Sequence, residues 1–334
     1  MAVIALIPAY DPDIKLIALV DQLKENAFDI VIVNDGSGPE YQEIFDRCRD
    51  KAHVIGYEEN SGKGYALKFG MTYILQNYPD AEGFITADAD GQHSVADICR
   101  VREELNAGAE FVISVRNLRR KAPFLSRLGN GVSRFMFAIA NARFLPDNQS
   151  GLRGFAMKHI EWMLKVSGFK YDYELNVLLV AEKQGIHLTK IPIETIYFDN
   201  NSGSHFKPFK DTVRIYKTYF QTNIFVVISC VIEFILVILA TIFFGYRYFA
   251  FIIMICFGIH YLLCMVVERF TLFREIKYRP GFRRLVIAII KYTVNTLICF
   301  ALQFLRVPFA VSFVIAAIII AVGEFYALKV TYDG

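Results

Sequence analysis

The sequence has no Cys-x-x-Cys pair, so the usual sign of a structural zinc site or a dithiol redox centre is missing. The six cysteines lie far apart, several of them within apolar runs: Cys48, Cys99, Cys230, Cys256, Cys264 and Cys299. Cysteine in apolar surroundings behaves as a small hydrophobic residue. We therefore expect all six to be reduced and structural.

The chain also lacks a marked net charge. Its 36 lysine and arginine residues nearly balance 33 aspartate and glutamate residues, which leaves a formal charge of +3 at pH 7. Because this balance provides no strong basic excess, we predict no nucleic-acid partner. A basic start is missing as well, since the short apolar stretch from Met1 to Ala9 has no lysine or arginine. That stretch predicts a first β-strand and not a signal peptide.

Apolar residues, by contrast, are abundant. Hydrophobic residues make up 54% of the 334, and the mean hydropathy is +0.36, which is high for a soluble protein. After Gln221 four apolar segments follow one another, at 222–244, 248–267, 285–305 and 309–328. Each approaches the ~20 residues that cross a bilayer core. The sequence therefore predicts an all-α domain of four transmembrane helices over 222–334, because the turn-sized links disfavour buried helices of a large soluble core.

The charges of the links orient these predicted spans. The link at 268–284 has two acidic residues and six basic ones: Arg269, Arg274, Lys277, Arg279, Arg283 and Arg284. The two short links have one arginine each. Because cytoplasmic loops carry the excess of lysine and arginine, we place this link, both termini and the N-terminal domain on the cytoplasmic face of the cell membrane.

Residues 206–221 lead into the first predicted span. Aromatic and basic positions alternate there, and the basic ones are Lys207, Lys210, Arg214 and Lys217. The pattern predicts an amphipathic helix that lies in the membrane interface, although a solvated basic surface has the same composition.

Four polar residues lie inside the predicted spans, and we expect two pairs, Lys291 with Glu324 and Glu233 with His260. An unpaired charge in lipid costs a few kcal/mol. For Lys291 and Glu324 the alternative is that each side chain reaches the interface. Such pairs can join two helices of one chain or two subunits, so a homo-oligomer is left open.

Up to about residue 205 the sequence has the pattern of an α/β domain. Short apolar runs predict strands at 3–7, 30–33, 85–87 and 111–114, and the helical stretches 13–26, 40–50, 62–77 and 94–107 supply the crossovers. Ligands of an open parallel sheet bind outside the carboxyl ends of its strands. The polar residues that follow the four runs should therefore meet in one crevice: Tyr10, Asp11, Asp35, Asp88, Asp90 and Arg116.

Asp88 and Asp90 flank Ala89 directly after a predicted strand. Two hard oxygen ligands at this spacing suit Mg²⁺ or Mn²⁺ beside a diphosphate, because these cations share their remaining positions with phosphate oxygens. Gln92 and His93 follow closely enough to add a ligand or to orient a substrate. An ordinary acidic turn has the same composition, so the tripeptide alone does not decide between the two interpretations.

A series of short segments stands in order along residues 3–220: Ile7-Pro8-Ala9-Tyr10, Val33-Asn34-Asp35-Gly36-Ser37, Asn60-Ser61-Gly62-Lys63-Gly64-Tyr65-Ala66-Leu67, Asp88-Ala89-Asp90-Gly91-Gln92-His93, Asp147-Asn148-Gln149-Ser150-Gly151-Leu152-Arg153, Tyr171-Asp172-Tyr173-Glu174, Ile191-Pro192-Ile193 and Ser204-His205-Phe206-Lys207-Pro208-Phe209. This ordered set resembles the family-2 glycosyltransferases, specifically the polyprenyl-phosphate (dolichyl-phosphate) mannosyl and glucosyl synthases. The four predicted spans, with Glu268-Arg269-Phe270-Thr271-Leu272-Phe273, resemble a GtrA-type membrane domain more loosely.

The resemblance implies a GT-A (Rossmann-like) α/β fold for residues 1–205, a nucleotide-sugar donor and a lipid-phosphate acceptor. It implies that Asp35 contacts the base or ribose, and that the metal is surrounded by Asp88, Asp90 and Gln92. The implied donor site consists of Pro8, Tyr10, Asp11, Asp35, Lys63, Asp88 and Ala89. Many relatives have Asn-Glu after the first tyrosine, where this chain has Asp11-Pro12. We expect either Asp11 or Asp13 to replace that glutamate.

On the acceptor side the resemblance places Ser150 and Arg153 near the lipid phosphate. A phosphate monoester is anionic near neutral pH, so its attack needs no strong general base. It does need cations that offset its repulsion with the donor diphosphate, and arginine binds phosphate through two parallel hydrogen bonds. The candidates in order of preference are Arg153, Arg116, Arg134 and Lys207, followed by Arg127 and Lys210.

Two further residues have two interpretations each. Glu174 either positions the sugar or a phosphate-binding arginine, or is a structural ion-pair partner. His93 either takes part in catalysis or only forms a hydrogen bond within the metal loop.

These features predict inverting transfer of a hexose from GDP-mannose or UDP-glucose to a polyprenyl or dolichyl phosphate. Transfer to another lipid acceptor, and combined synthesis and flipping of the product, are the alternatives. A processive polysaccharide synthase is disfavoured because its Gln-x-x-Arg-Trp motif is missing, and the single tryptophan is Trp162. A transporter with a sensor domain is disfavoured by the metal and acceptor motifs.

Overall fold

The computed structural model describes residues 2–116 and 144–193, together with scattered positions within 131–138 and 235–323. The chain divides into two compact units, one of Met1–Gly131 with Pro146–Tyr216 and one of Val132–Leu145 with Lys217–Gly334. Nearly all of the four predicted spans, and the whole of the predicted interfacial helix, lie outside the described residues. Within the described residues, no helix is both long and apolar enough to cross a membrane.

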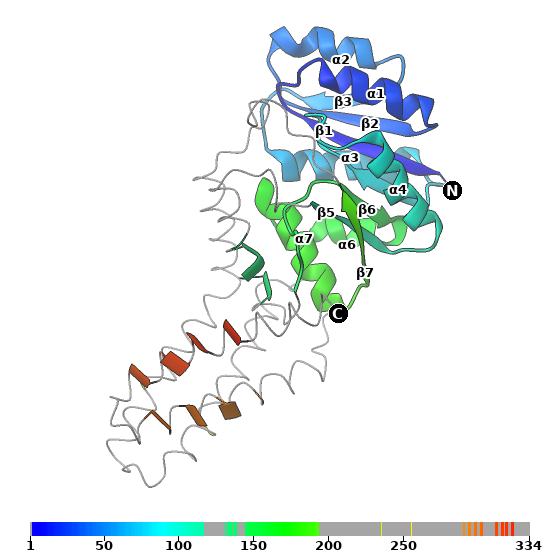
Figure 1. Ribbon diagram of the computed structural model, residues 1–334. Helices are drawn as coiled ribbons and strands as arrows, with labels where there is room; N and C mark the ends of the chain where they lie inside the picture. Colours follow the sequence, from blue (N-terminus) through cyan, green and yellow to red (C-terminus); the bar gives the residue numbers. More distant parts are fainter. Residues whose placement is uncertain are drawn as a thin grey trace. The chain divides into compact units, whose positions relative to one another are not determined.

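The first unit is built on a seven-stranded sheet, which can be followed in Figure 1. Its strands are β1 Val3–Ala9, β2 Asp29–Asp35, β3 His53–Tyr57, β4 Gly83–Thr86, β5 Phe111–Arg116, β6 Arg153–Ala156 and β7 Leu188–Ile193, in the order β3-β2-β1-β4-β6-β5-β7. All pairs are parallel except those that β6 makes with β4 and β5. The four predicted strands are confirmed, while β3, β6 and β7 were not predicted as strands.

The helices of this unit are α1 Lys15–Glu25, α2 Gln42–Cys48, α3 Lys63–Asn77, α4 Val95–Asn106, α6 Ile160–Lys165 and α7 Tyr171–Gln184. Short 3₁₀ turns cover Pro39–Tyr41 and Met157–His159. The first four helices confirm the predicted crossovers to within a few residues. Helix α4 begins after Ser94, whose hydroxyl accepts the Asp97 N–H at 3.1 Å. This N-cap fixes where the polar loop after β4 ends.

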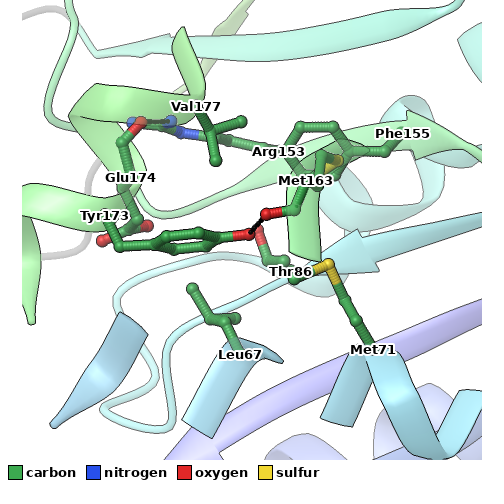
Figure 2. A pocket seen from close by; sticks show the side chains of 9 residues that line it. All are labelled: Leu67, Met71, Thr86, Arg153, Phe155, Met163, Tyr173, Glu174 and Val177. Atoms are coloured by element: carbon green, nitrogen blue, oxygen red, sulfur yellow. Dashed lines mark hydrogen bonds between the residues drawn. The ribbon is translucent and has the colours of Figure 1, made fainter. Parts of the chain in front are cut away.

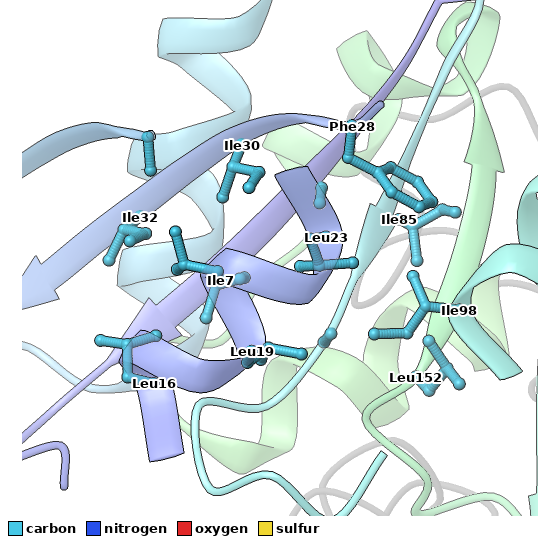
Figure 3. Close-up of a cluster of buried hydrophobic side chains, with 14 of the residues drawn as sticks. Ile7, Leu16, Leu19, Leu23, Phe28, Ile30, Ile32, Ile85, Ile98 and Leu152 are labelled. Carbon is cyan, nitrogen blue, oxygen red and sulfur yellow. The ribbon is translucent and has the colours of Figure 1, made fainter. Parts of the chain in front are cut away.

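Two helix layers cover the sheet. On one face the apolar side of α1 packs on alternate strand residues, and Figure 3 shows Leu16, Leu19 and Leu23 beside Ile7 and Ile30. Burying each such side chain contributes about 1.5–3 kcal/mol.

Helix α3 covers the opposite face, where Gly70 lies so close to the sheet that an added Cβ would come 2.3 Å from Leu6 Cδ1. Residues of β1 are therefore buried on both faces, which explains why this strand is an unbroken apolar run.

Candidate active site

The carboxyl ends of β1, β2, β4 and β5 lie at the same edge of the sheet, because these strands run parallel. The antiparallel strand β6 begins at this edge, since its first residue, Arg153, pairs with the last residue of β4, Thr86. The segment that precedes β6 is thereby brought against the loop that follows β4. The edge consequently collects polar residues from distant parts of the chain.

Lys63, Asp88 and Glu174 form the centre of this edge. The Lys63 ammonium lies 2.7 Å from Asp88 Oδ1 and 2.9 Å from Glu174 Oε2. His93 adds a contact of 3.3 Å between its Nε2 and Asp88 Oδ2. Lys63 is the first residue of α3 and Glu174 lies in the first turn of α7, so two helix N-termini and the β4 loop meet here.

The two aspartates of the β4 loop ionise differently. Burial opposes ionisation of Asp88, but the charge of Lys63 and the hydrogen bond to His93 outweigh it and hold the pKa of Asp88 well below its usual value. Burial raises the pKa of Asp90, and the neighbouring charge of Asp88 raises it further. One Asp90 oxygen accepts the Gln92 N–H at 3.0 Å. Because the two carboxylates repel each other at the end of one strand, a bound cation would stabilise their ionised forms.

A divalent cation fits these residues. The donors are hard carboxylate oxygens, as Mg²⁺ and Mn²⁺ prefer. Among the described residues there is no group of three or more His, Cys, Asp or Glu that could hold a metal. A cation bound by Asp88 and Asp90 would therefore take its other ligands from Gln92, water and substrate oxygens.

Gly151 explains how the segment before β6 approaches Asp88. A Cβ on Gly151 would lie 2.4 Å from Asp88 Oδ2 and 2.7 Å from Oδ1. The Gly151 carbonyl accepts the Thr86 hydroxyl at 2.9 Å, which fixes the segment to the end of β4. Only a residue without a side chain permits this close approach.

Arg116 forms a buried ion pair with Asp147. Its Nε donates to Asp147 Oδ2 at 2.6 Å and its Nη2 donates to Oδ1 at 3.1 Å. The Asp147 side chain has no exposed surface, while that of Arg116 is 18% exposed. Burial opposes ionisation of Asp147, yet Arg116 outweighs this and keeps the Asp147 pKa below its ordinary value. The pair joins the end of β5 to the segment before β6.

Arg153 is buried and bonded to the backbone. It is only 2% exposed, and its guanidinium donates to three backbone carbonyls, of Ser150 at 2.9 Å, Glu174 at 2.6 Å and Asn148 at 3.3 Å. Arg153 therefore fixes the 148–150 segment and the start of α7 together. Contact between Arg153 and an acceptor stays a prediction.

Ser150 is fully buried. Its hydroxyl shares a hydrogen bond with that of Ser114, which also donates to the Leu152 carbonyl at 2.8 Å. In the structure Ser150 thus connects the segment before β6 to β5.

Asp35 organises the loop that enters α3. Its carboxylate accepts the Tyr57 hydroxyl at 2.7 Å, the Ser61 N–H at 2.9 Å and the Gly62 N–H at 3.1 Å. Asp35 is 3% exposed, so these bonds hold the residues just before Lys63 in place. Its predicted contact with a base or ribose stays a prediction.

The loop after β1 has a constrained backbone. Asp11 has φ +46°, and its N–H donates to the Ser37 hydroxyl at 2.9 Å. Tyr10 is 38% exposed, and the charge of Asp11 raises its pKa. Pro8, Ala89 and Gln92 are half-buried along the same edge. The exposed face of the Tyr10 ring can stack on a planar group.

A small pocket lies behind this edge, between α3 and α7 (Figure 2). Apolar side chains such as Leu67, Met71 and Val177 line most of it, and Arg153 and Glu174 also contribute. The Tyr173 hydroxyl donates to the Met163 carbonyl at 2.9 Å, which ties α7 to α6. The pocket therefore lies among the residues that hold α3, α6 and α7 together next to the site.

For some predicted site residues the structure does not test whether they reach this edge. Arg134 is half-buried and belongs to the second unit. Lys207, Lys210 and Arg127 lie outside the described residues. The structure in turn adds residues that pattern analysis did not select, namely Thr86, Ser114, Asp147 and Gly151. Asp147 and Gly151 stand within a recognised segment, but their contacts depend on the antiparallel strand β6.

Comparison with known proteins gives the following similarities. The sequence model described as "Glycosyl transferase family 2" matches residues 5–161. An uncharacterised protein of Methanocaldococcus jannaschii is 30% identical over 207 residues, which cover 58% of this chain and 82% of that protein.

Two named relatives are more distant. The UDP-N-acetylglucosamine–dolichyl-phosphate N-acetylglucosaminyltransferase of Methanococcus voltae is 28% identical over 216 residues, covering 58% of this chain and 84% of the relative. The polyprenol monophosphomannose synthase of Mycolicibacterium smegmatis is 24% identical over 206 residues, covering 57% and 76%.

Among solved structures, glucosyl-3-phosphoglycerate synthase of Mycobacterium tuberculosis, crystallised with Mn²⁺, UDP and phosphoglyceric acid, superposes with a TM-score of 0.51. The two chains are 13% identical, and the match covers 66% of this chain and 77% of that one. At this identity the likeness shows a shared fold.

Proposed function

We propose that this chain, which belongs to glycosyl transferase family 2, transfers one sugar from a nucleoside-diphosphate sugar to a polyprenyl phosphate. Its first unit has the GT-A α/β fold. The names of two relatives describe action on dolichyl phosphate and synthesis of polyprenol monophosphomannose. That shared acceptor chemistry supports the proposal.

The observation that carries the proposal is the cluster of Asp88, Asp90 and Lys63 at the end of β4. The Lys63 ammonium lies 2.7 Å from Asp88 Oδ1, and Asp90 follows Asp88 by two residues in the same loop. Lys63 is the first residue of α3, and the backbone N–H groups of a helix N-terminus attract phosphate. A diphosphate bound here meets cationic groups on its helix side.

In this proposal Asp88 and Asp90 hold Mg²⁺ or Mn²⁺ with Gln92 beside them. When bound, that cation supplies positive charge to the departing diphosphate. Lys63 supplies a second positive charge from the protein itself. The donor nucleoside then lies along Pro8, Tyr10, Asp11 and Asp35, at the ends of β1 and β2.

The transfer needs little proton chemistry. A phosphate oxygen of the acceptor forms the new bond to the anomeric carbon while the bond from that carbon to the donor diphosphate breaks, and its electron pair leaves with the diphosphate. The attacking oxygen is already anionic, so no general base is required. The protein must instead hold two anions, the donor diphosphate and the acceptor phosphate, close together. Positioning and charge stabilisation are therefore its main contributions to catalysis.

On the acceptor side we place Arg116 first among the described cations. Its side chain is partly exposed, whereas Arg153 is buried and its guanidinium donates to backbone carbonyls. Asp147 holds the Arg116 guanidinium by two bonds, so the arginine meets a phosphate in a fixed orientation. Arg153 and Ser150 act by keeping the 148–150 segment in place. Arg134 and Lys207 complete the acceptor side in this proposal.

We also propose a location for the chain. The hydropathy and charge pattern of residues 222–334 supports four spans of a GtrA-like domain, with the catalytic unit on the cytoplasmic face and residues 206–221 in the interface. A polyprenyl chain in the bilayer would then present its phosphate to the catalytic edge. The sugar in this proposal is a hexose, carried by GDP-mannose or UDP-glucose, with UDP-N-acetylglucosamine added because of one relative's name.

A donor-by-acceptor panel tests the proposal. Full-length protein in detergent is incubated with Mn²⁺, polyprenyl phosphate and each labelled nucleotide sugar, and label in the organic phase is counted. We expect label from one donor, and a loss of at least about a hundredfold in Asp90→Asn, since one metal ligand is removed. Asp21→Asn, which changes an exposed partner of Lys51, should retain the label. Absence of extractable label with every donor would refute the transferase proposal for this acceptor.

A further inference from the structure

Lys63 shares its ammonium between two carboxylates that have different surroundings. Asp88 belongs to the β4 loop and its side chain is 29% exposed, whereas the Glu174 side chain on α7 is 12% exposed. Asp88 is one of the proposed metal ligands, and a cation cannot approach its Oδ1 closely while the ammonium is 2.7 Å away. Lys63 and the divalent cation therefore compete for the same oxygen.

The helices that carry Lys63 and Glu174 are fixed against each other. The Tyr65 N–H donates to the Phe169 carbonyl at 2.9 Å, and a Cβ on Gly64 would lie 2.5 Å from Tyr173 Cβ. These contacts join the N-terminus of α3 to the N-terminus of α7. The Lys63–Glu174 pair is consequently set by the framework and does not depend on the conformation of the β4 loop.

Glu174 has room for a further hydrogen bond. Its Oε1 is buried and has no hydrogen-bond partner among the described residues. A buried acceptor without a partner is costly. A lysine ammonium has three N–H donors, and a small rotation would let it serve both oxygens of Glu174.

We propose that Lys63 is an internal counter-ion of the metal site: its ammonium occupies Asp88 while the divalent cation is absent, yields that carboxylate when the cation binds, and is kept beside the donor diphosphate by Glu174. Glu174 is thus a positioning residue that acts through Lys63. The inference rests on the proposed function, because it takes Asp88 and Asp90 as the metal ligands.

This arrangement links metal binding to donor binding. The ammonium opposes the cation when no donor is present, and it offsets the donor's negative charge once the diphosphate arrives. Two ligands that each remove an obstacle for the other bind with positive coupling. The neutral variant Lys63→Met should therefore bind the bare metal more tightly and the nucleotide less tightly.

The test is a titration of Mn²⁺ with purified full-length protein in detergent, without nucleotide, in which electron paramagnetic resonance measures free Mn²⁺. Lys63→Met should raise the affinity for Mn²⁺ about tenfold, which corresponds to about 1.4 kcal/mol. Glu174→Gln should lower it several-fold, because the ammonium then stays on Asp88. The double variant should match Lys63→Met, since Glu174 acts only through Lys63.

Matched controls separate this effect from general damage. Lys51→Met and Glu110→Gln remove exposed ion pairs elsewhere and should leave Mn²⁺ affinity unchanged. Lys63→Arg, which keeps the charge, should bind Mn²⁺ more weakly than Lys63→Met does. In a second titration, with Mn²⁺ present, UDP or GDP should bind less tightly to Lys63→Met than to the unaltered protein.

The outcomes discriminate between the two proposals. Unchanged or weaker Mn²⁺ binding by Lys63→Met would overturn the counter-ion role while leaving the metal site intact. The same would follow if Glu174→Gln changed the affinity equally with and without Lys63. If the unaltered protein did not bind Mn²⁺ at all, or if Asp90→Asn bound it equally well, the metal site of the proposed function would be wrong, and the counter-ion role would fall with it.

Discussion

Gly151→Ala is the most specific perturbation of the catalytic edge, because it adds one methyl group against Asp88. The added Cβ would lie 2.4 Å from Oδ2, 2.7 Å from Oδ1 and 2.8 Å from Cγ of Asp88. Gly151 is buried, and its carbonyl is held by Thr86, so the backbone cannot easily withdraw. The carboxylate must therefore shift from the position in which it contacts Lys63 and His93.

The expected size of the effect of Gly151→Ala on Mn²⁺ affinity follows from the free-energy cost of overpacking. Forcing a methyl group into a filled site costs about 1–3 kcal/mol. If that cost falls on the position of Asp88, Mn²⁺ affinity should drop between about fivefold and about 150-fold. Sugar transfer should fall at least as much, because Asp88 is also needed in the transition state. Mn²⁺ titration and label extraction measure the two effects on the same preparation.

Gly108→Ala provides a control matched for lost stability. Gly108 has φ +96°, and an added Cβ meets nothing within 4 Å, so alanine there costs about 1–2 kcal/mol in backbone strain alone. It should lower the unfolding temperature and leave Mn²⁺ affinity unchanged. If Gly151→Ala bound Mn²⁺ as tightly as the unaltered protein, the close approach of this segment would not be what positions Asp88.

Further predictions concern the framework around the edge. Arg116→Met should destabilise the protein by about 3 kcal/mol, because it leaves the buried Asp147 charge unpaired, and Arg116→Met with Asp147→Asn should recover part of that loss in thermal unfolding. The fold lowers the Asp147 pKa. The ionised Asp147 therefore contributes fully to the free energy of unfolding above its unfolded-state pKa of about 3.9, and this contribution should be lost as the pH falls below that value. Cys48 is fully buried, and burial raises its thiol pKa to about 11. At about pH 8 iodoacetamide should therefore label Cys99 in preference to Cys48, as measured by peptide mass spectrometry. Equal labelling of the two cysteines would contradict the packing. Ser94→Ala should cost about 1 kcal/mol by removing the α4 cap, and an unchanged unfolding temperature would show that the cap is dispensable.

Four strands of the sheet and the first four helices could be predicted because their signals are local. The runs in β1, β2, β4 and β5 are strongly apolar, and the intervening helices have a regular polar side. Strand β6 could not be found in this way. It is four residues long, it contains Arg153 and Gly154, and it pairs with β4 and β5 only through long-range contacts. Its antiparallel direction depends on the tertiary fold and not on its own composition.

The candidate site divides in the same way. Asp88 and Asp90 were predicted as a strand-end pair, since their position follows from the end of an apolar run. The partner of Lys63 could not be predicted, because Glu174 lies on a different helix and only the packing of α3 on α7 brings them together. Arg153 is the instructive case. Its place in a recognised segment predicted a position near the lipid phosphate, and that contact stays a prediction. Its buried guanidinium donates to three backbone carbonyls, which the segment alone did not indicate.

The chemical identity of both products shows which bond of the donor is broken. Full-length protein is incubated with the active nucleotide sugar and polyprenyl phosphate, and the organic and aqueous phases are analysed by mass spectrometry. We expect equal amounts of a nucleoside diphosphate and a lipid in which one sugar is joined to a single phosphate. A nucleoside monophosphate with a lipid diphosphate sugar would contradict this expectation, because the bond broken would then be within the diphosphate and not at the anomeric carbon.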